Sequence, residues 1–198
     1  MKALLRIPCL ALGALLALAG CANDVPQFSG IDITGAEGYA NDFRLTDHDG
    51  KTRTMADFRG KVVAMFFGYT QCPDVCPTTM SDLRKVMQQL GPDADKVQVL
   101  FVTLDPKRDT PAVLAKYVPS FHPSFLGLYG DAAATEKTAR DFKIFYREQP
   151  GKSPESYTLD HTAGTLVFDG KGRLRLFHNY GLSPEAIASD FKLLLKQG

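Results

Sequence analysis

The sequence predicts an α/β domain in which buried parallel strands alternate with helices. Apolar, β-rich runs at residues 61–69 and 97–104 are typical of central strands that are buried on both faces. Segments with apolar residues at helical spacing follow each of these runs. A strand-turn-strand pattern around Asp169-Gly170 adds an antiparallel hairpin near the C-terminus. A length of 198 residues, 44% of them hydrophobic, suits one domain with a substantial core.

The first segment of the chain, residues 1–20, has the pattern of a secretory signal peptide. Lys2 and Arg6 form a short basic region, and residues 7–20 are apolar but too few for a comfortable membrane span. The run ends in Leu-Ala-Gly followed by Cys21, which is similar to a bacterial lipobox. This similarity implies cleavage before Cys21 and lipidation of its thiol. The alternative is an ordinary signal peptide with a chance cysteine at its end.

Residues 21–39 are rich in glycine and polar residues without a sustained period, and we expect them to form a tether. The folded domain is therefore predicted at residues 40–198. Removal of the signal and lipidation of Cys21 leave this domain with two cysteines, Cys72 and Cys76. In an oxidising compartment, such a lone close pair is either a disulfide or a protected dithiol.

The elements of the first half of the domain follow from local signals. Two short alternating runs on either side of residues 47–50 predict a β-hairpin. The strand at 61–69 is followed by a helix over 78–90, with Pro77 in its first turn and a Gly-Pro stop. After the strand at 97–104, a loop opens a short helix that begins at Pro111.

The second half begins with a short strand at 125–130 and a helix over 132–146. A polar loop at 147–159 leads to the C-terminal hairpin, and Ser183 caps a last helix that ends near Lys196. This order predicts a thioredoxin-like fold with an added N-terminal β-hairpin. In such a fold, the loop between the first central strand and the next helix carries the chemistry, and both Cys72 and Cys76 lie there.

Cys72 and Cys76 form a Cys-x-x-x-Cys pattern, one residue longer than the usual redox motif. Near a helix N-terminus a thiolate is stabilised, and a thiolate is both a nucleophile and a metal ligand, so location alone does not distinguish the two roles. The extra residue and the flanking Pro73 and Pro77 should let both sulfurs converge on one soft cation. A disulfide between them also remains open.

A third ligand should come from elsewhere, and His161 is the best candidate. It lies just before the C-terminal hairpin, which in a thioredoxin-like sheet comes close to the cysteine loop. His48, in a polar turn, and His122, beside a proline, are predicted at the surface. His178, near the end of what should be an edge strand, is predicted to be structural or solvated.

The loop at residues 105–111 has two interpretations. Asp105 and Asp109 could lie beside the cysteine loop, at the carboxyl end of the second central strand, and contact a partner. Alternatively, Asp105 begins a turn and either Asp109 or Thr110 caps the following helix. The sequence favours this second, structural interpretation.

Three motifs together resemble the Sco/SenC family of copper-binding proteins that assemble cytochrome c oxidase: GYTQCPDVCPTTM, VTLDPKRDTP and LDHTAGTLVFD. The resemblance implies a thioredoxin-like fold and a copper ion held by Cys72, Cys76 and His161. Two thiolates and an imidazole suit Cu(I), and with added oxygen or nitrogen ligands the same set can hold Cu(II). Zinc normally requires a fourth ligand. Oxidation to a Cys72–Cys76 disulfide would switch copper binding off.

The resemblance further implies a membrane-tethered copper metallochaperone that assists assembly of the CuA centre. The expected partners are the CuA-containing subunit of cytochrome c oxidase, a periplasmic copper donor chaperone, a thiol reductant and the membrane, through the lipid anchor. The expected location is the bacterial cell envelope, facing the periplasm. Nucleic acid is not expected as a partner, because acidic and basic residues are interspersed without a cationic block.

The alternative function is a thiol-disulfide oxidoreductase that reduces the cysteines of the CuA site. Its catalytic residues would be Cys72 and Cys76, and it would be indifferent to His161. A peroxidase-like function would need a single reactive cysteine in its own motif, and a purely structural disulfide would close too short a loop to add much stability. The sequence leaves open whether the protein is an enzyme.

Overall fold

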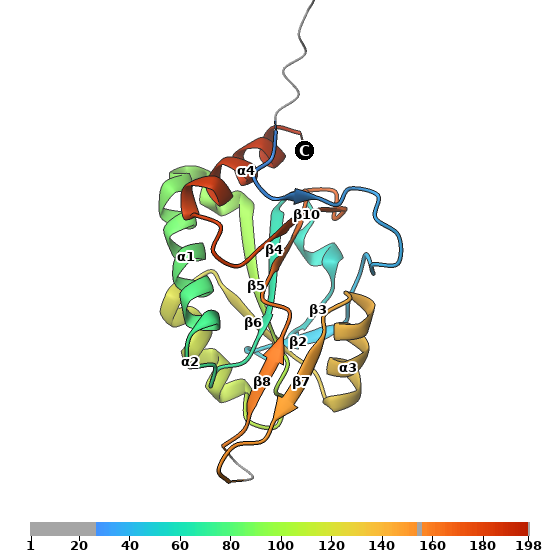
Figure 1. The fold of residues 1–198 in the computed structure, drawn as a ribbon. Helices are drawn as coiled ribbons and strands as arrows, with labels where there is room; N and C mark the ends of the chain where they lie inside the picture. The colour runs from blue at the N-terminus through green and yellow to red at the C-terminus, as the bar shows by residue number, and fades with distance from the viewer. Residues whose placement is uncertain (1–26, 154–155, 198) are drawn as a thin grey trace, which may run out of the picture.

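The computed structural model describes residues 27–153 and 156–197, in which one large sheet is flanked by helices (Figure 1). The large sheet has eight strands in the order β1-β10-β9-β4-β5-β6-β2-β3, and β7 pairs with β8 in a separate sheet. The strands of the large sheet are β1 (Ile31–Asp32), β2 (Leu45–Asp47), β3 (Thr52–Arg53), β4 (Val62–Gly68), β5 (Val97–Thr103), β6 (Leu126–Tyr129), β9 (Thr165–Phe168) and β10 (Leu174–His178). The separate sheet consists of β7 (Tyr146–Gln149) and β8 (Thr158–His161). The helices are α1 (Val75–Leu90), α2 (Pro111–Phe121), α3 (Ala132–Asp141) and α4 (Pro184–Lys196), with 3-10 helices η1 (Met55–Phe58) and η2 (Gly91–Lys96).

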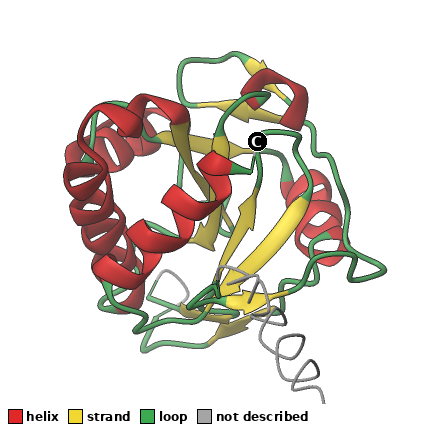
Figure 2. Cartoon of the chain, turned by 90° about the horizontal axis from the view of Figure 1, so that it is seen from above, coloured by secondary structure: helices red, strands yellow, loops and turns green. Residues whose placement is uncertain are grey.

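The centre of the molecule is the parallel pair β4 and β5, in which every residue is buried. Helices α1 and α2 lie on one side of the sheet and α3 on the other, so both faces of these strands are covered (Figures 1 and 2). Strand β6 continues the parallel arrangement, and β9 joins β4 in antiparallel orientation. This order of parallel strands, antiparallel hairpin and final helix is the predicted one.

Most of the predicted elements are present, with shifts at their ends. The N-terminal hairpin forms from β2 and β3, the C-terminal hairpin from β9 and β10, and the Ser183 hydroxyl caps α4. Helix α1 begins at Val75, three residues earlier than the predicted Thr78. Backbone N–H groups in the first turn of a helix have no acceptor within the helix, so a proline there loses no hydrogen bond. Pro77 can therefore lie inside the first turn and does not mark the start of the helix. Cys76 therefore belongs to the helix itself.

The predicted helix over 132–146 and the predicted loop over 147–159 are both wrong in part. Helix α3 ends at Asp141, and Lys143 adopts a left-handed conformation with a φ of 56° that a helix cannot contain. The chain then forms β7, which pairs with β8 so that Tyr146 lies opposite His161. Strand β7 is mostly charged and polar, so it carries no alternation of apolar residues that would have revealed it.

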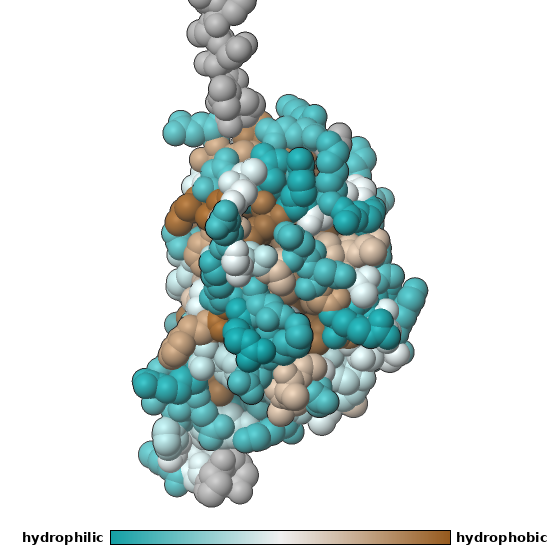
Figure 3. All heavy atoms as spheres, turned by 90° about the vertical axis from the view of Figure 1, so that its right-hand side faces the viewer, coloured by the Kyte–Doolittle hydropathy of each residue, from teal (hydrophilic) through white to brown (hydrophobic). Residues whose placement is uncertain are grey.

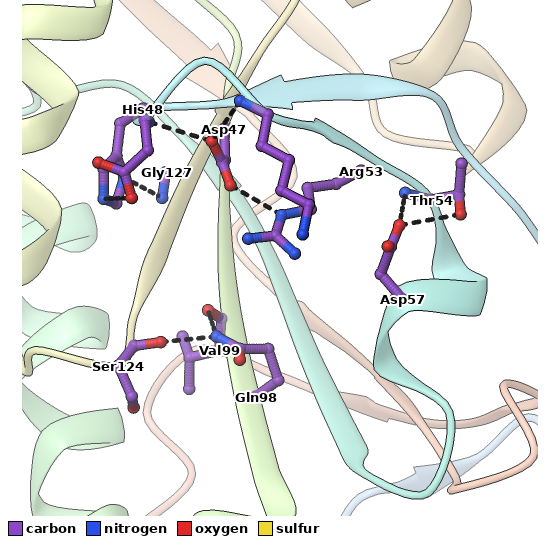
Figure 4. Close-up of polar contacts among 11 residues, drawn as sticks. Asp47, His48, Arg53, Thr54, Asp57, Gln98, Val99, Ser124 and Gly127 are labelled. Carbon is purple, nitrogen blue, oxygen red and sulfur yellow. Dashed lines mark hydrogen bonds and ion pairs between the residues drawn. The ribbon is translucent and has the colours of Figure 1, made fainter.

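Buried polar contacts hold the N-terminal hairpin together and connect it to the neighbouring strand β6 (Figure 4). The Asp47 carboxylate is fully buried and accepts a hydrogen bond from Arg53 Nε at 2.7 Å. The backbone N–H of Gly127 on β6 donates to Nδ1 of His48 at 3.0 Å. The prediction that His48 lies at the surface is therefore wrong, because its ring accepts a hydrogen bond from β6 and its side chain is only 7% exposed.

The last part of the predicted tether is paired with the sheet. Strand β1 pairs with β10, and the backbone N–H groups of Ser29 and Gly30 donate to the Asp190 carboxylate at 2.8 and 2.9 Å. On the side of the molecule that carries α3 and this segment, the surface is mostly hydrophilic with separate apolar patches (Figure 3). The predicted signal peptide and the predicted lipidation site, Cys21, lie outside the described residues. Within the described residues, no helix is both long and apolar enough to span a membrane.

Candidate metal centre

The cysteine loop lies between the buried end of β4 and the first turn of α1. Cys72 is half-buried in this loop, and Cys76 is buried on the helix. The backbone N–H of Cys76 points at the Sγ atom of Cys72, with an N···S distance of 3.4 Å. The α1 N-terminus thus stabilises negative charge on Cys72. No disulfide joins the two cysteines here, and the disulfide that the sequence leaves open stays a prediction.

His161, the last residue of β8, completes a three-residue cluster with the two cysteines. Its Nε2 atom lies 3.5 Å from Sγ of Cys76. The two sulfurs and a ring nitrogen of His161 lie within 4.8 Å of one another, and among the described residues these three form the one cluster of His, Cys and acidic side chains that could hold a metal ion. The structure thus brings together the three residues that the sequence nominated.

The His161 ring is held in one orientation by its surroundings. Nδ1 lies 3.0 Å from the carbonyl oxygen of Thr162, to which it donates as an N–H. This hydrogen bond fixes the ring so that Nε2 faces the sulfurs, and Nε2 would supply the lone pair to a bound metal, as in many metal-binding histidines. The rings of Phe66 and Tyr69 each meet the imidazole edge-on, with centroids 6.1 Å away. The nitrogen donor is therefore pre-oriented toward the cysteines.

The two thiols differ strongly in acidity. A hydrogen bond from the Cys76 thiol is the main influence on Cys72 and, together with His161 and the helix N–H groups, it lowers the pKa of Cys72 to about 3 against the opposing effect of burial. The adjacent Cys72 thiolate and then burial raise the pKa of Cys76. The pair therefore presents one thiolate and one thiol, and a soft metal cation would displace the remaining proton.

Gly68, the last residue of β4, leaves the space that the Cys76 sulfur occupies. A Cβ atom at this position would lie 2.9 Å from Cys76 Sγ, 2.9 Å from the Phe66 ring and 3.1 Å from the Phe101 ring. No side chain larger than hydrogen fits there unless both the sulfur and the buried rings move. The position of Cys76 is thus determined by close packing as well as by the helix.

The loop after β5 supports the cysteine loop through Asp109. This buried carboxylate accepts hydrogen bonds from the Thr70 backbone N–H at 3.0 Å, from the Thr70 hydroxyl at 2.5 Å and from the Thr103 hydroxyl at 2.6 Å. Burial raises the pKa of Asp109, although these hydrogen bonds oppose the shift. Thr110, not Asp109, caps α2. Asp109 therefore does lie beside the cysteine loop, as the less favoured interpretation required.

Asp105, the other acid of this loop, is also buried. It forms an ion pair with Arg108 and accepts a hydrogen bond from the hydroxyl of Tyr157 at 2.7 Å. Sequence reasoning missed Thr70, Tyr157 and Gly68 as residues that shape the site. Their closeness in sequence to Cys72 and His161 was the available signal, but nothing local reveals that Thr70 and Tyr157 meet buried acids or that Gly68 packs against Cys76.

Two further histidines lie outside the cluster. His178 is 2% exposed, and its Nε2 lies 2.9 Å from the Asp190 carboxylate, which confirms a structural role. It does not lie on an edge strand, because β1 pairs with β10 on its outer side. The ring of His122 is partly exposed at the C-terminus of α2, and its Nδ1 lies 2.8 Å from the Ser124 hydroxyl.

Comparisons with known proteins agree on one family. A sequence model of the family described as SCO1/SenC matches residues 32–196. The mitochondrial SCO2 homolog of Bos taurus is 38% identical over 153 residues, which are 76% of this chain and 58% of that protein. The chain therefore spans less than two thirds of the length of this relative.

Two solved structures match the fold closely. Bradyrhizobium japonicum ScoI, determined with copper bound, is 40% identical with a TM-score of 0.73, covering 79% of this chain and 99% of that one. Apo Sco1 from Thermus thermophilus is 37% identical with a TM-score of 0.72, covering 86% of this chain and 96% of that one. These likenesses confirm the predicted thioredoxin-like fold, and with the match of the family model they show that this chain belongs to the SCO1/SenC family.

Proposed function

We propose that this protein is a copper chaperone that holds copper, as its cargo, through Cys72, Cys76 and His161. The observation that carries the proposal is the convergence of two sulfurs and an oriented imidazole nitrogen within 4.8 Å. The donor set fits the metal, since thiolates and imidazole favour Cu(I), and added oxygen or nitrogen ligands allow Cu(II). The copper-bound state of Bradyrhizobium japonicum ScoI supports the same choice of metal.

The burial of the cluster suits transfer of the ion. Cys72 and His161 are only partly buried, whereas Cys76 lies in the core. An incoming thiolate can therefore reach the metal from the side of Cys72, while Cys76 keeps its place on α1. Binding requires both cysteines to be reduced, so a Cys72–Cys76 disulfide would release the metal and block reloading.

The cellular setting is part of the same proposal. The family resemblance implies assembly of the CuA centre of cytochrome c oxidase, with a periplasmic donor chaperone supplying copper and a thiol reductant keeping the cysteines reduced. Lipidation of Cys21 would hold the protein at the periplasmic face of the bacterial cell envelope. The chain between Cys21 and the sheet-paired β1 would then be the tether.

A thiol-disulfide oxidoreductase is the second candidate, and one observation favours it. Cys72 is partly exposed with a pKa of about 3, and the buried Cys76 lies beside it. This is the arrangement of an attacking thiolate and a resolving thiol. Such a protein could reduce the cysteines of the CuA site before metal insertion, and it would not require His161.

Competition for Cu(I) against a chromophoric chelator separates the two functions. Wild type, His161→Ala and Cys72→Ser/Cys76→Ser are compared, with His122→Ala as a histidine control outside the cluster. The chaperone proposal expects one copper per wild-type chain. It expects an affinity at least about tenfold lower, or about 1.4 kcal/mol, in His161→Ala, which loses one ligand, and in Cys72→Ser/Cys76→Ser, which loses two. If His161→Ala binds as tightly as wild type, the ligand set is wrong and the oxidoreductase leads.

A further inference from the structure

The three candidate ligands come from two separately anchored parts of the molecule. Cys72 lies in the β4–α1 connection and Cys76 in the first turn of α1, and both are continuous with the core of the large sheet. His161 belongs to the β7–β8 hairpin, which forms a sheet of its own. Figure 1 shows this hairpin extending from the body of the molecule. A two-stranded hairpin is marginally stable by itself, so the position of His161 depends on how the hairpin is docked.

Apolar packing beneath the hairpin is sparse. Among the eight residues of the two strands, only Leu159 is buried. A cavity of about 170 Å³ lies between the hairpin, the loop after β5 and the start of α3, where it is bounded by Tyr146, Leu159 and Thr135 among others. The Thr135 hydroxyl is buried there without a hydrogen-bond partner. Hydrophobic contact is therefore a weak source of docking energy for this hairpin.

A buried polar cluster of Asp105, Arg108 and Tyr157 connects the hairpin to the loop after β5 instead, and we refer to these three residues as the latch. The Tyr157 hydroxyl donates to Asp105 Oδ1 at 2.7 Å, and an Arg108 Nη1–H donates to the Tyr157 carbonyl at 2.8 Å. The Arg108 guanidinium lies 3.5 Å from the centroid of the Tyr157 ring and forms an ion pair with Asp105. Tyr157 directly precedes β8, four residues before His161 in the chain.

The latch is largely shielded from solvent. Asp105 is 3% exposed, Tyr157 9%, and the Arg108 side chain 12%. Burial and the hydrogen bond to Asp105 raise the pKa of Tyr157 to about 12, so its hydroxyl remains a donor at neutral pH. The nearby Lys107–Glu148 pair, by contrast, is exposed with a separation of 3.8 Å, and such surface pairs contribute little.

We propose that the latch is the positioning device for His161, so that Arg108 and Tyr157 set the affinity for copper without touching it. The inference rests on the proposed function and adds to it the element that controls the third ligand. When the latch is intact, the hairpin docks and the imidazole faces the sulfurs. When it is weakened, a fraction of molecules offers only the two cysteines, and the apparent affinity falls with that fraction.

A double-mutant cycle for Cu(I) affinity, measured on the full chain by chelator competition, tests this role. Arg108→Ala should lower the affinity at least about fivefold when His161 is present, and less than about twofold in a His161→Ala background, because the latch acts through that ligand. Arg108→Lys should recover part of the loss, since it restores the charge but not the planar fork. Arg147→Ala on β7 is the matched control, because this arginine is exposed and alternates along the strand with Tyr146 and Glu148, which border the cavity beside the latch.

A second measurement needs no metal and does not use Arg108→Ala, so it tests the latch even if that variant is destabilised. Amide hydrogen exchange of β7 and β8 is compared in the metal-free Tyr157→Phe and Tyr146→Phe variants. Tyr157→Phe removes only the hydroxyl that reaches Asp105 and should speed exchange of the hairpin about fivefold, as expected for one hydrogen bond of about 1 kcal/mol. Tyr146 lies on the same hairpin, and Tyr146→Phe should leave the amide exchange rates of β7 and β8 unchanged.

The outcomes separate failure of this inference from failure of the proposed function. If Arg108→Ala weakens copper equally with and without His161, or if Tyr157→Phe leaves hairpin exchange at the wild-type rate, the latch does not position the ligand and the inference is overturned. The chaperone proposal survives that result. If His161→Ala itself binds copper as tightly as wild type, the ligand set fails and the inference falls with it.

Discussion

Replacement of Gly68 by alanine tests whether close packing determines the position of Cys76. The added Cβ would lie 2.9 Å from the Cys76 sulfur and 2.9 Å from the Phe66 ring, whereas ordinary contact begins at 3.4 Å, so reaching ordinary contact requires both the sulfur and this buried ring to move by about 0.5 Å. The rings of Phe66 and Phe101 have no exposed surface and little room to move. Overpacking of this kind typically costs about 1–3 kcal/mol, and alanine recovers at most about 1 kcal/mol through lower chain entropy.

We therefore expect Gly68→Ala to lose about 1–2 kcal/mol of unfolding free energy in urea denaturation of the metal-free protein. It should also lose copper affinity, because metal–ligand distances tolerate errors of only about 0.2 Å. Gly170→Ala is the matched control, since a Cβ there would meet its nearest neighbours at an ordinary 3.5 Å. If Gly68→Ala matches wild type in both stability and copper affinity, packing does not determine where the sulfur lies.

Three further predictions concern the hydrogen bonds and charges around the site. Thr70→Val removes the hydroxyl that donates to the buried Asp109 carboxylate, so we expect a loss of about 1–2 kcal/mol in urea denaturation, and unchanged stability would contradict this. With a pKa of about 3, Cys72 should react with iodoacetamide at a nearly constant rate between about pH 5 and 8. The reaction rate of an ordinary thiol rises about tenfold per pH unit in this range, and such a rise for Cys72 would refute the lowered pKa. Burial raises the pKa of Asp190, but hydrogen bonds from His178 and two backbone N–H groups outweigh it and lower the folded-state pKa below 3.8. The ionised Asp190 carboxylate therefore stabilises the fold fully above the ordinary carboxyl pKa, and this stabilisation is lost as the pH falls through the folded-state value. Asp190→Asn should lower the free energy of unfolding by about 2 kcal/mol at pH 7 and by progressively less toward pH 3. A loss that does not change with pH would contradict this.

The sequence alone predicted the elements whose signals are local. The apolar runs that became β4 and β5 predicted buried central strands, because they are short and rich in β-branched and aromatic residues, and a strand covered on both faces hides every residue. Turn residues located the two hairpins of the large sheet, and Ser183 located the start of α4. The position of Cys72 and Cys76 at a helix N-terminus followed from the same order of elements. The position of His161 just before the C-terminal hairpin nominated it as their partner, and the motif resemblance agreed.

Tertiary structure alone decided how these residues are supported. Strand β7 is polar and partly exposed, so no periodic pattern distinguishes it from a loop, and only its pairing with β8 defines it. The contacts of Asp109 with Thr70 and of Asp105 with Tyr157 join residues 39 and 52 positions apart in the chain. A buried carboxylate needs partners wherever the fold can supply them, and their identity depends on which loops meet in space rather than on the local order of residues. For that reason the sequence indicates which atoms could bind copper, while the fold determines what holds those atoms together.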